Sequence, residues 1–275
     1  MSRFPADKLF LGCADDGAVL LAASATSAPG VLASVRVDPA GSAIGLCEAL
    51  HDLSPLSSRA GARALSVTID DGFTRNFVVH PPGGARGLRE LRASAAARFA
   101  ALYGESAESW LLAADWQAAR PFVASAVPRS LYAACEQVAR QLGCRLDSVS
   151  PAMIRVWNRV YASIPGDGWL VVGFGRTLSL LHTAAGQVAG LRSLRLGGAP
   201  EPAELEALLE QERLRASADA ATRARQSLLW AGAADWLPAT ATMVGLASRT
   251  IRLSEALPPG DLPGARQLAL AGDRQ

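Results

Sequence analysis

The most constraining feature of the chain is the segment GWLVVGFGRTLSLLHTAAGQVAGLRSLRLGG, residues 168–198. Three apolar runs of strand-forming residues alternate there with two short turns that contain glycine. Glycine tolerates the positive φ that tight hairpin turns require, so the segment predicts three consecutive antiparallel strands. Together with helical patterns elsewhere in the chain, these strands predict a mixed α/β fold.

Strand and helix patterns also fill the rest of the chain. Asp-Asp-Gly separates two apolar runs at 15–17 and again at 70–72, and we interpret both sites as β-hairpin turns. We predict further strands at 30–37, 108–116, 121–127, 144–151 and, as a final pair, within 241–257. We predict helices at 41–54, 83–104, 128–143, 151–164 and 201–230.

Composition and charge exclude several classes of protein. Half of the 275 residues are hydrophobic, which is enough for a large core. The formal net charge is only +2 and the arginines are scattered, so we expect no nucleic-acid partner. The first residues lack the apolar stretch of a signal peptide, and no run approaches the ~18 apolar residues of a membrane span. We therefore expect a cytoplasmic protein without a membrane span.

The strongest break in the pattern is Pro-Gly-Asp-Gly at 165–168. We place a domain boundary there, with a first lobe at 1–165 and a second, smaller lobe at 166–257. The remaining residues, 258–275, are rich in proline and glycine, and we predict a flexible tail.

Three stretches carry a resemblance to a known family: AVPRSLYAACEQVARQLGCRLDSVSPAMIRVWN (126–158), the segment 168–198, and LSVTIDDGFTRNFVVHPP (65–82). Together they resemble the PilM-type proteins of type IV pilus machines and the cytoplasmic part of GspL-type proteins of type II secretion. The resemblance implies a two-lobed actin-like ATPase fold, which is ribonuclease-H-like, with mixed α/β sheets flanked by helices.

An ATPase of this superfamily would need Asp-x-Gly at the first turn of each lobe and a glycine-rich loop against adenosine. Here the first turn is Ala14-Asp15-Asp16-Gly17, which is out of phase, and the second has Gly173 in the place of the aspartate. The only candidate for the adenosine loop is 241–248, with the single Gly245. The resemblance leaves these vestigial phosphate-turn residues: Asp16, Gly17, Gly173, Gly175, Arg176, Thr177, Gly197 and Gly198.

We therefore predict a worn-out nucleotide site, with no ATP cofactor and no catalytic residue, and we leave weak nucleotide binding open. The pairs Asp15/Asp16 and Asp70/Asp71 each lack a third acidic or histidine ligand nearby in the sequence. Turn formation explains them better than metal ligation does, and no metal site is expected. The histidines are far apart, and we interpret the tryptophans as core residues.

Two functions compete at this stage. By resemblance, the chain is a non-catalytic scaffold peripheral to the inner membrane, which binds the cytoplasmic segment of a PilN-like membrane protein and links it to the assembly ATPase. An edge strand or a groove between the lobes would capture this segment as an extended peptide. The alternative is a nucleotide- or sugar-phosphate-handling, kinase-like enzyme of the same superfold, since fold does not fix function. The sequence does not decide between a pilus and a secretion machine. It also leaves the oligomeric state open, and a homodimer is one of the alternatives.

Overall fold

The computed structural model describes residues 8–24, 27–38, 40–53, 64–85, 87–216, 226–253 and 261–271. The chain divides into two compact units, each built from separate stretches of sequence. The first unit contains residues 1–73, 128–159 and 253–275, and the second contains 74–127 and 160–252. Each unit is described by itself.

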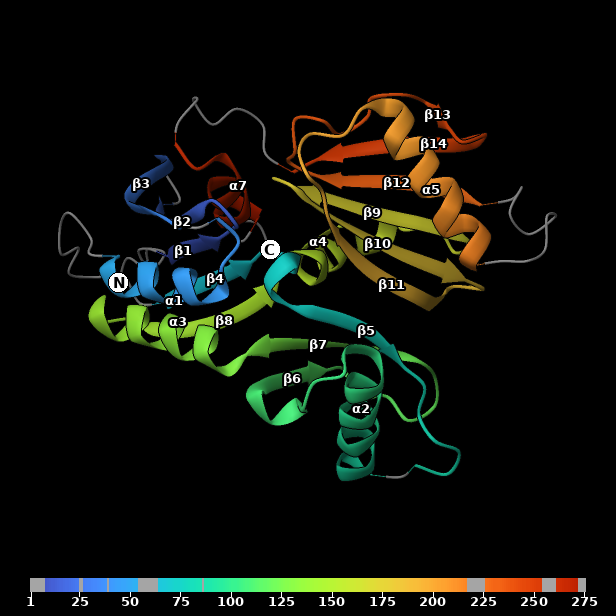
Figure 1. Ribbon diagram of the computed structural model, residues 1–275, viewed down its shortest axis with the longest axis horizontal. Coiled ribbons are helices and arrows are strands. Elements are labelled where there is room, and N and C mark those ends of the chain that lie inside the picture. Colours follow the sequence, from blue (N-terminus) through green and yellow to red (C-terminus); the bar gives the residue numbers. More distant parts are fainter. Residues whose placement is uncertain are drawn as a thin grey trace, which may run out of the picture. The chain divides into compact units, whose positions relative to one another are not determined.

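The first unit is built around a five-stranded sheet in the order β3-β2-β1-β4-β8 (Figure 1). Its strands are β1 (Lys8–Cys13), β2 (Gly17–Ser24), β3 (Ser27–Arg36), β4 (Ala64–Ile69) and β8 (Arg145–Pro151). Its helices are α1 (Ala43–Asp52), α3 (Arg129–Gln141), α4 (Ala152–Val160), α7 (Pro263–Ala271) and the short 3₁₀ helix η1 (Asp71–Phe73). The pairs β1–β2 and β2–β3 are antiparallel, whereas β4 runs parallel to both β1 and β8.

Helix α7 packs directly on strands β1 and β2. A Cβ atom at Gly12 in β1 would overlap backbone atoms of Ala265 and Ala269, so only glycine allows this close approach. The helix contributes buried apolar residues to the unit, among them Ala265 and Leu268, which are fully inaccessible to solvent. Residues 261–271 therefore belong to the core of the first unit and do not form the flexible tail that the sequence predicted.

The second unit contains two sheets (Figure 1). A three-stranded sheet has the order β5-β7-β6, and a six-stranded sheet has the order β11-β10-β9-β12-β14-β13. The strands of the small sheet are β5 (Arg75–Val79), β6 (Trp110–Ala114) and β7 (Phe122–Pro128), and its helices are α2 (Leu88–Tyr103) and the 3₁₀ helix η2 (Ala107–Ser109). The large sheet consists of β9 (Gly168–Phe174), β10 (Thr177–Ala184), β11 (Gln187–Arg195), β12 (Ser227–Gly232), β13 (Thr242–Met243) and β14 (Leu246–Arg252), with helix α5 (Pro202–Ala216) and the 3₁₀ helix η3 (Tyr161–Ser163).

Each sheet of the second unit has its own apolar core. Helix α2 buries Leu91, Ala95 and Phe99 in a cluster with aromatic residues of the small sheet. Helix α5 buries Leu205 and Leu209 in a cluster with residues of the large sheet, which includes the fully buried Trp230. The predicted meander at 168–198 is confirmed as β9, β10 and β11, which pair antiparallel in sequence.

The predicted ends of two helices are also confirmed. Gly104 follows α2 with φ of 67°, and Gly143 lies just past α3 with φ of 64°. Both values fall in the left-handed region, which glycine enters without steric cost and which ends a helix cleanly. None of the helices in the described ranges is long and apolar enough to span a membrane.

The predicted hairpin at 64–79 is wrong, because its two strands lie in different sheets. Strand β4 pairs with β1 and β8, while β5 pairs with β7. The Asp-Asp-Gly turn between them forms η1, in which the Asp70 carboxylate accepts a hydrogen bond from the Gly72 amide at 2.7 Å. Asp71 accepts a hydrogen bond from the Met153 amide at 2.9 Å, so it satisfies a donor at the start of α4.

The predicted long helix at 201–230 is confirmed only in its first half. Helix α5 ends at Ala216, and residues 227–232 form β12 between β9 and β14. The residues between them, 217–225, lie outside the described part. A short apolar run in the middle of a sheet has no periodicity that distinguishes it from a buried helix, which explains the error.

The two units also differ from the predicted lobes. Residues 74–127 group with the second unit and not with the first, and residues 261–271 group with the first unit. The break predicted near residue 165 lies close to the observed one at 159/160. The chain crosses between units several times, and a boundary drawn along the sequence cannot represent such crossings.

Candidate functional site

The first predicted phosphate turn joins β1 to β2 as a tight hairpin. The Ala14 amide donates to the Gly17 carbonyl at 2.8 Å, and the Gly17 amide donates back at 3.3 Å. A Cβ atom at Gly17 would overlap the carbonyl oxygen of Val35 in β3. Gly17 is therefore explained by the packing of the sheet, without any ligand.

The carboxylate of Asp16 lies at the start of α7. Burial and the neighbouring Asp15 raise the pKa of this carboxyl group, while the backbone amides of Gly264 and Ala265 oppose the rise. Amides at a helix N-terminus favour a negative charge, so Asp16 serves the internal contact between the first turn and α7. This is a structural role that needs no ligand.

The acidic pairs Asp15/Asp16 and Asp70/Asp71 meet at one end of the first sheet. Strands β1 and β4 are parallel, and the Asp70 amide donates to the Cys13 carbonyl at 2.8 Å. Within the described residues, no group of three or more His, Cys, Asp or Glu side chains could hold a metal ion. Asp70 and Asp71 are instead engaged by the turn and by the start of α4, as described above.

The second predicted phosphate turn joins β9 to β10 at residues 174–177, and Trp236 covers it. The indole Nε1 of Trp236 donates to the carbonyl of Gly175 at 2.8 Å. An added Cβ atom at Gly173 would lie 2.7 Å from Cη2 of the same indole and 3.0 Å from Leu237. An aspartate at Gly173 would therefore collide with the indole ring.

The loop after β12 holds Trp236 in this position. The Gly173 carbonyl accepts hydrogen bonds from the amides of Ala233 and Ala234, at 3.1 Å and 3.2 Å. Gly232, with φ of 141°, lies so close that a Cβ atom there would overlap the Gly173 carbonyl oxygen. The Gly173 carbonyl is thus hydrogen-bonded within the second unit, and the loop after β12 is fixed beside the turn.

The remaining turn residues have ordinary structural roles. Thr177 is buried at the start of β10, where it pairs with Phe174 and Arg195. The carbonyl of Arg176 accepts a hydrogen bond from the Leu196 amide at 2.7 Å. Gly197 and Gly198 are exposed between β11 and α5, and a Cβ atom on either would meet nothing within 4 Å. No close backbone approach explains this glycine pair.

The proposed adenosine loop forms a hairpin turn. Val244 and Gly245 have φ of 46° and 73° and connect β13 to β14, where Met243 pairs with Leu246. Two consecutive residues with positive φ are typical of a two-residue type I′ turn. Trp236 could not be identified from the sequence as a site residue, because most tryptophans lie in apolar elements and core packing was the favoured interpretation. The available signal was the Gly-Ala-Ala run at 232–234 directly after a buried strand.

The small sheet of the second unit offers a different kind of site. Strand β6 ends the order β5-β7-β6, and its residues, Trp110 to Ala114, include no charge and no proline. Exposed edge strands usually carry charged residues or proline, which prevent pairing with other chains. Strand β6 is therefore an apolar sheet edge with the backbone geometry to accept an extended peptide.

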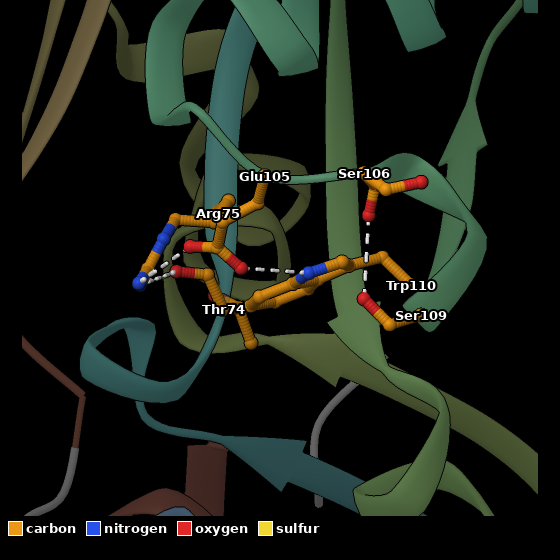
Figure 2. A network of polar contacts seen from close by, with 6 residues as sticks. All are labelled: Thr74, Arg75, Glu105, Ser106, Ser109 and Trp110. Atoms are coloured by element: carbon orange, nitrogen blue, oxygen red, sulfur yellow. Dashed lines mark hydrogen bonds and ion pairs between the residues drawn. The ribbon is translucent and has the colours of Figure 1, made fainter.

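An aromatic and ionic cluster fixes the start of β6 (Figure 2). The Arg75 guanidinium lies 5.4 Å from the ring centroids of both Tyr103 and Trp110. Glu105 pairs with Arg75 at 3.8 Å and accepts a hydrogen bond from Trp110 Nε1 at 3.0 Å. Burial raises the pKa of Tyr103, and Arg75 and Arg98 oppose that rise. The cluster joins β5, α2 and β6.

The comparisons with known proteins identify the fold. No family model and no curated protein sequence matches the chain. A Bacteroides thetaiotaomicron protein with an actin-like ATPase fold and unknown function superposes with a TM-score of 0.52 at 10% identity, over 86% of each chain. The chain therefore has the actin-like ATPase fold, as the sequence predicted.

Two other solved structures match over nearly the full length. The PilM-PilN type IV pilus biogenesis complex matches with a TM-score of 0.59 at 14% identity, over 96% of this chain and 97% of that one. The cytoplasmic domain of EpsL, an inner-membrane component of the type II secretion system of Vibrio cholerae, matches with a TM-score of 0.52 at 16% identity. That match covers 97% of this chain and 94% of the EpsL domain.

Proposed function

We propose that this actin-like chain is a cytoplasmic scaffold of a type IV pilus or type II secretion assembly platform, and that it binds the cytoplasmic segment of an inner-membrane partner. The observation that carries the proposal is the filled turn between β9 and β10. Trp236 takes the space beside Gly173, and its indole bonds the Gly175 carbonyl. A phosphate group at this turn would need the space that this indole occupies.

The full-length likeness to PilM and to the EpsL domain supports the same role. PilM was solved in a complex with PilN, so a PilN-like protein is the partner class that we propose here. A link to the assembly ATPase and attachment to the inner membrane through the partner are further parts of the proposal. The filled turn weighs against the kinase-like alternative.

Within this function, we assign capture of the partner to strand β6. An extended segment would add to the small sheet through backbone hydrogen bonds, which give affinity with little demand on side chains. Its apolar side chains would contact the half-buried Leu111 and the exposed Ala113. The Arg75–Glu105–Trp110 cluster would hold the edge in place before binding, which lowers the ordering cost.

The test is titration of the protein with synthetic peptides that match the cytoplasmic segments of inner-membrane pilus and secretion proteins of the same organism. We expect saturable binding of one segment, weakened by Ala113→Lys at the edge. Ala93→Lys is the matched control, because Ala93 is also exposed but belongs to α2 and not to β6. Equal affinity of the two variants would remove β6 from the proposal, and failure of all segments to bind would overturn the scaffold function.

A further inference from the structure

Hydroxyl groups gather on one face of strands β4 and β8 in the first unit. The parallel register sets Ser66 beside Ser148 and Thr68 beside Ser150. The Oγ atoms of Ser66 and Ser148 are 2.8 Å apart, so these two side chains lie on the same face. Because side chains alternate along a strand, Thr68 and Ser150 share that face.

Helix α4 adds a positive charge to this face. Nη2 of Arg155 donates to the Val67 carbonyl at 3.0 Å and to Ser148 Oγ at 3.1 Å. Arg155 forms no ion pair with a carboxylate in the part of the chain that the structure describes; Asp147, on the same strand as Ser148, pairs with Arg145 at 2.7 Å. Burial lowers the pKa of the Arg155 guanidinium, and Asp147 only partly opposes this.

Hydrogen-bond donors outnumber acceptors at this site. Nε of Arg155 is buried and has no acceptor, and the Thr68 hydroxyl, in a residue that is 1% exposed, has no partner. The bond between Ser66 and Ser148 uses only one of their two hydroxyl protons, since Ser148 also accepts from Arg155. Arg155 Nε and the Thr68 hydroxyl thus find no acceptor among the described residues, and one serine proton remains beside them.

Such a set of donors is costly unless something accepts from it. Burying a charge without a partner or a polar group without a hydrogen bond costs free energy, and an unsatisfied group in a native structure points to a missing water or ion. A water molecule brings two protons of its own and no charge. An oxyanion brings several acceptor atoms and a negative charge that can pair with the Arg155 guanidinium. Hydrogen bonds between charged groups are stronger than those between neutral groups.

We propose that Arg155, Ser66, Ser148 and Thr68 form a binding site for a small free oxyanion such as phosphate, sulfate or a carboxylate. Arg155 supplies the charge and its unpartnered Nε donor from α4. The hydroxyls of β4 and β8 supply the remaining donors from the sheet below. This site is independent of the proposed scaffold function, and it involves neither of the two turns discussed above.

The test is calorimetric titration of the purified chain with inorganic phosphate, sulfate, acetate and chloride into the tens of millimolar, at constant ionic strength. We expect saturable binding of the oxyanions and weaker binding of chloride, which offers no separate acceptor atoms. Arg155→Met should reduce phosphate affinity by about tenfold or more, the size expected for losing hydrogen bonds to a charged group. Arg145→Gln is the control, because Arg145 is exposed on β8 and its loss changes the net charge by the same amount.

A second variant keeps the test valid if Arg155→Met does not fold. Thr68→Val preserves shape and removes the unpartnered hydroxyl, so it should leave the ligand-free protein as stable as the wild type or more stable, and still weaken phosphate binding several-fold. An absence of saturable binding by every oxyanion would overturn the proposal. So would equal losses of affinity in Arg155→Met and Arg145→Gln, because the effect would then be one of general charge.

Discussion

At the residue scale, the side chains around Gly173 decide whether the turn between β9 and β10 has room for a ligand. The sequence alone predicts that this position lacks the aspartate of a nucleotide site, and this much follows from the motif. The structure adds a packing reason, because the indole of Trp236 lies where a side chain at position 173 would go. The sequence could not predict this contact, since the two residues are far apart in the chain and meet only when β9 pairs with β12.

The packing at Gly173 gives a direct prediction for stability. Gly173→Ala would force its Cβ atom to 2.7 Å from Cη2 of Trp236, and overpacking of this kind costs about 1–3 kcal/mol. The free energy of unfolding from urea titration measures the effect. Gly197→Ala, where a Cβ atom meets nothing within 4 Å, should change stability by less than about 0.5 kcal/mol. If the two variants are equally stable, Trp236 does not fill the turn.

Single acidic residues also show where sequence patterns stop being informative. Both Asp-Asp-Gly sites were predicted as hairpin turns; the first is one, and the second is a 3₁₀ helix between strands of different sheets. Their further roles depend on helices from distant parts of the chain, with Asp16 at the start of α7 and Asp71 at the start of α4. A local motif predicts the turn, but it does not predict which helix will donate backbone hydrogen bonds to the aspartate carboxylate.

At the element scale, helix α7 is the largest departure from the sequence-based prediction. Leu268 on this helix is completely buried, and α7 packs on β1 and β2. Leu268→Ala should therefore lower the free energy of unfolding by about 2–5 kcal/mol, the range for a buried leucine. Leu214→Ala on α5 is the control, because Leu214 is 57% exposed. Urea unfolding of both variants tests the assignment. If Leu268→Ala leaves the free energy of unfolding unchanged, α7 does not belong to the core of the first unit.

A buried polar network in the large sheet links one residue of β9 and one of β10 to Gln226, which directly precedes β12. Trp169 Nε1 donates to Gln226 Oε1 at 3.1 Å, which directs the amide nitrogen of Gln226 to Nε2 of His182 at 3.0 Å. Nε2 of His182 must then accept, so the imidazole is neutral. Burial lowers the pKa of His182, and Asp167 opposes this shift.

The lowered pKa of His182 predicts how stability depends on pH. The unfolded chain binds a proton near the ordinary histidine pKa of about 6.5, whereas the folded chain does so only at lower pH. The stabilisation by neutral His182 is therefore complete above that value and is lost as the pH falls through the folded pKa. Urea unfolding between neutral and mildly acidic pH should show this loss, and His182→Gln should reduce it. His80→Gln, at an exposed position, should keep the wild-type pH dependence, and identical slopes in all three proteins would contradict the role of His182.

Elements with strong local signals could be predicted from the sequence. The meander of β9, β10 and β11 and the end of α2 at Gly104 are of this kind, because apolar runs bounded by glycine turns act over a few residues. Strand β12 was missed because a short buried run has no such periodicity. Strand β4 was paired with the wrong neighbour because its partner β8 lies about 80 residues further along the chain.

At the scale of the whole molecule, the fold is that of actin-like ATPases, and the function has to be argued from its sites. The turn between β9 and β10 is filled by the protein's own Trp236, and the apolar edge β6 is braced by the cluster around Arg75. These two features favour binding of another protein over phosphate chemistry. The sequence predicted the first only as a missing aspartate and offered no motif for the second, because an open sheet edge is a property of topology.

If Trp236 fills the turn between β9 and β10, this turn receives no nucleotide. Calorimetric titration of the purified chain with Mg-ATP and with ADP, reaching the millimolar range, is the decisive measurement. We expect no saturable heat in either titration. Magnesium-dependent binding at micromolar concentration would contradict this expectation, because Trp236 would then have to leave the turn and the enzyme alternative would become the better explanation.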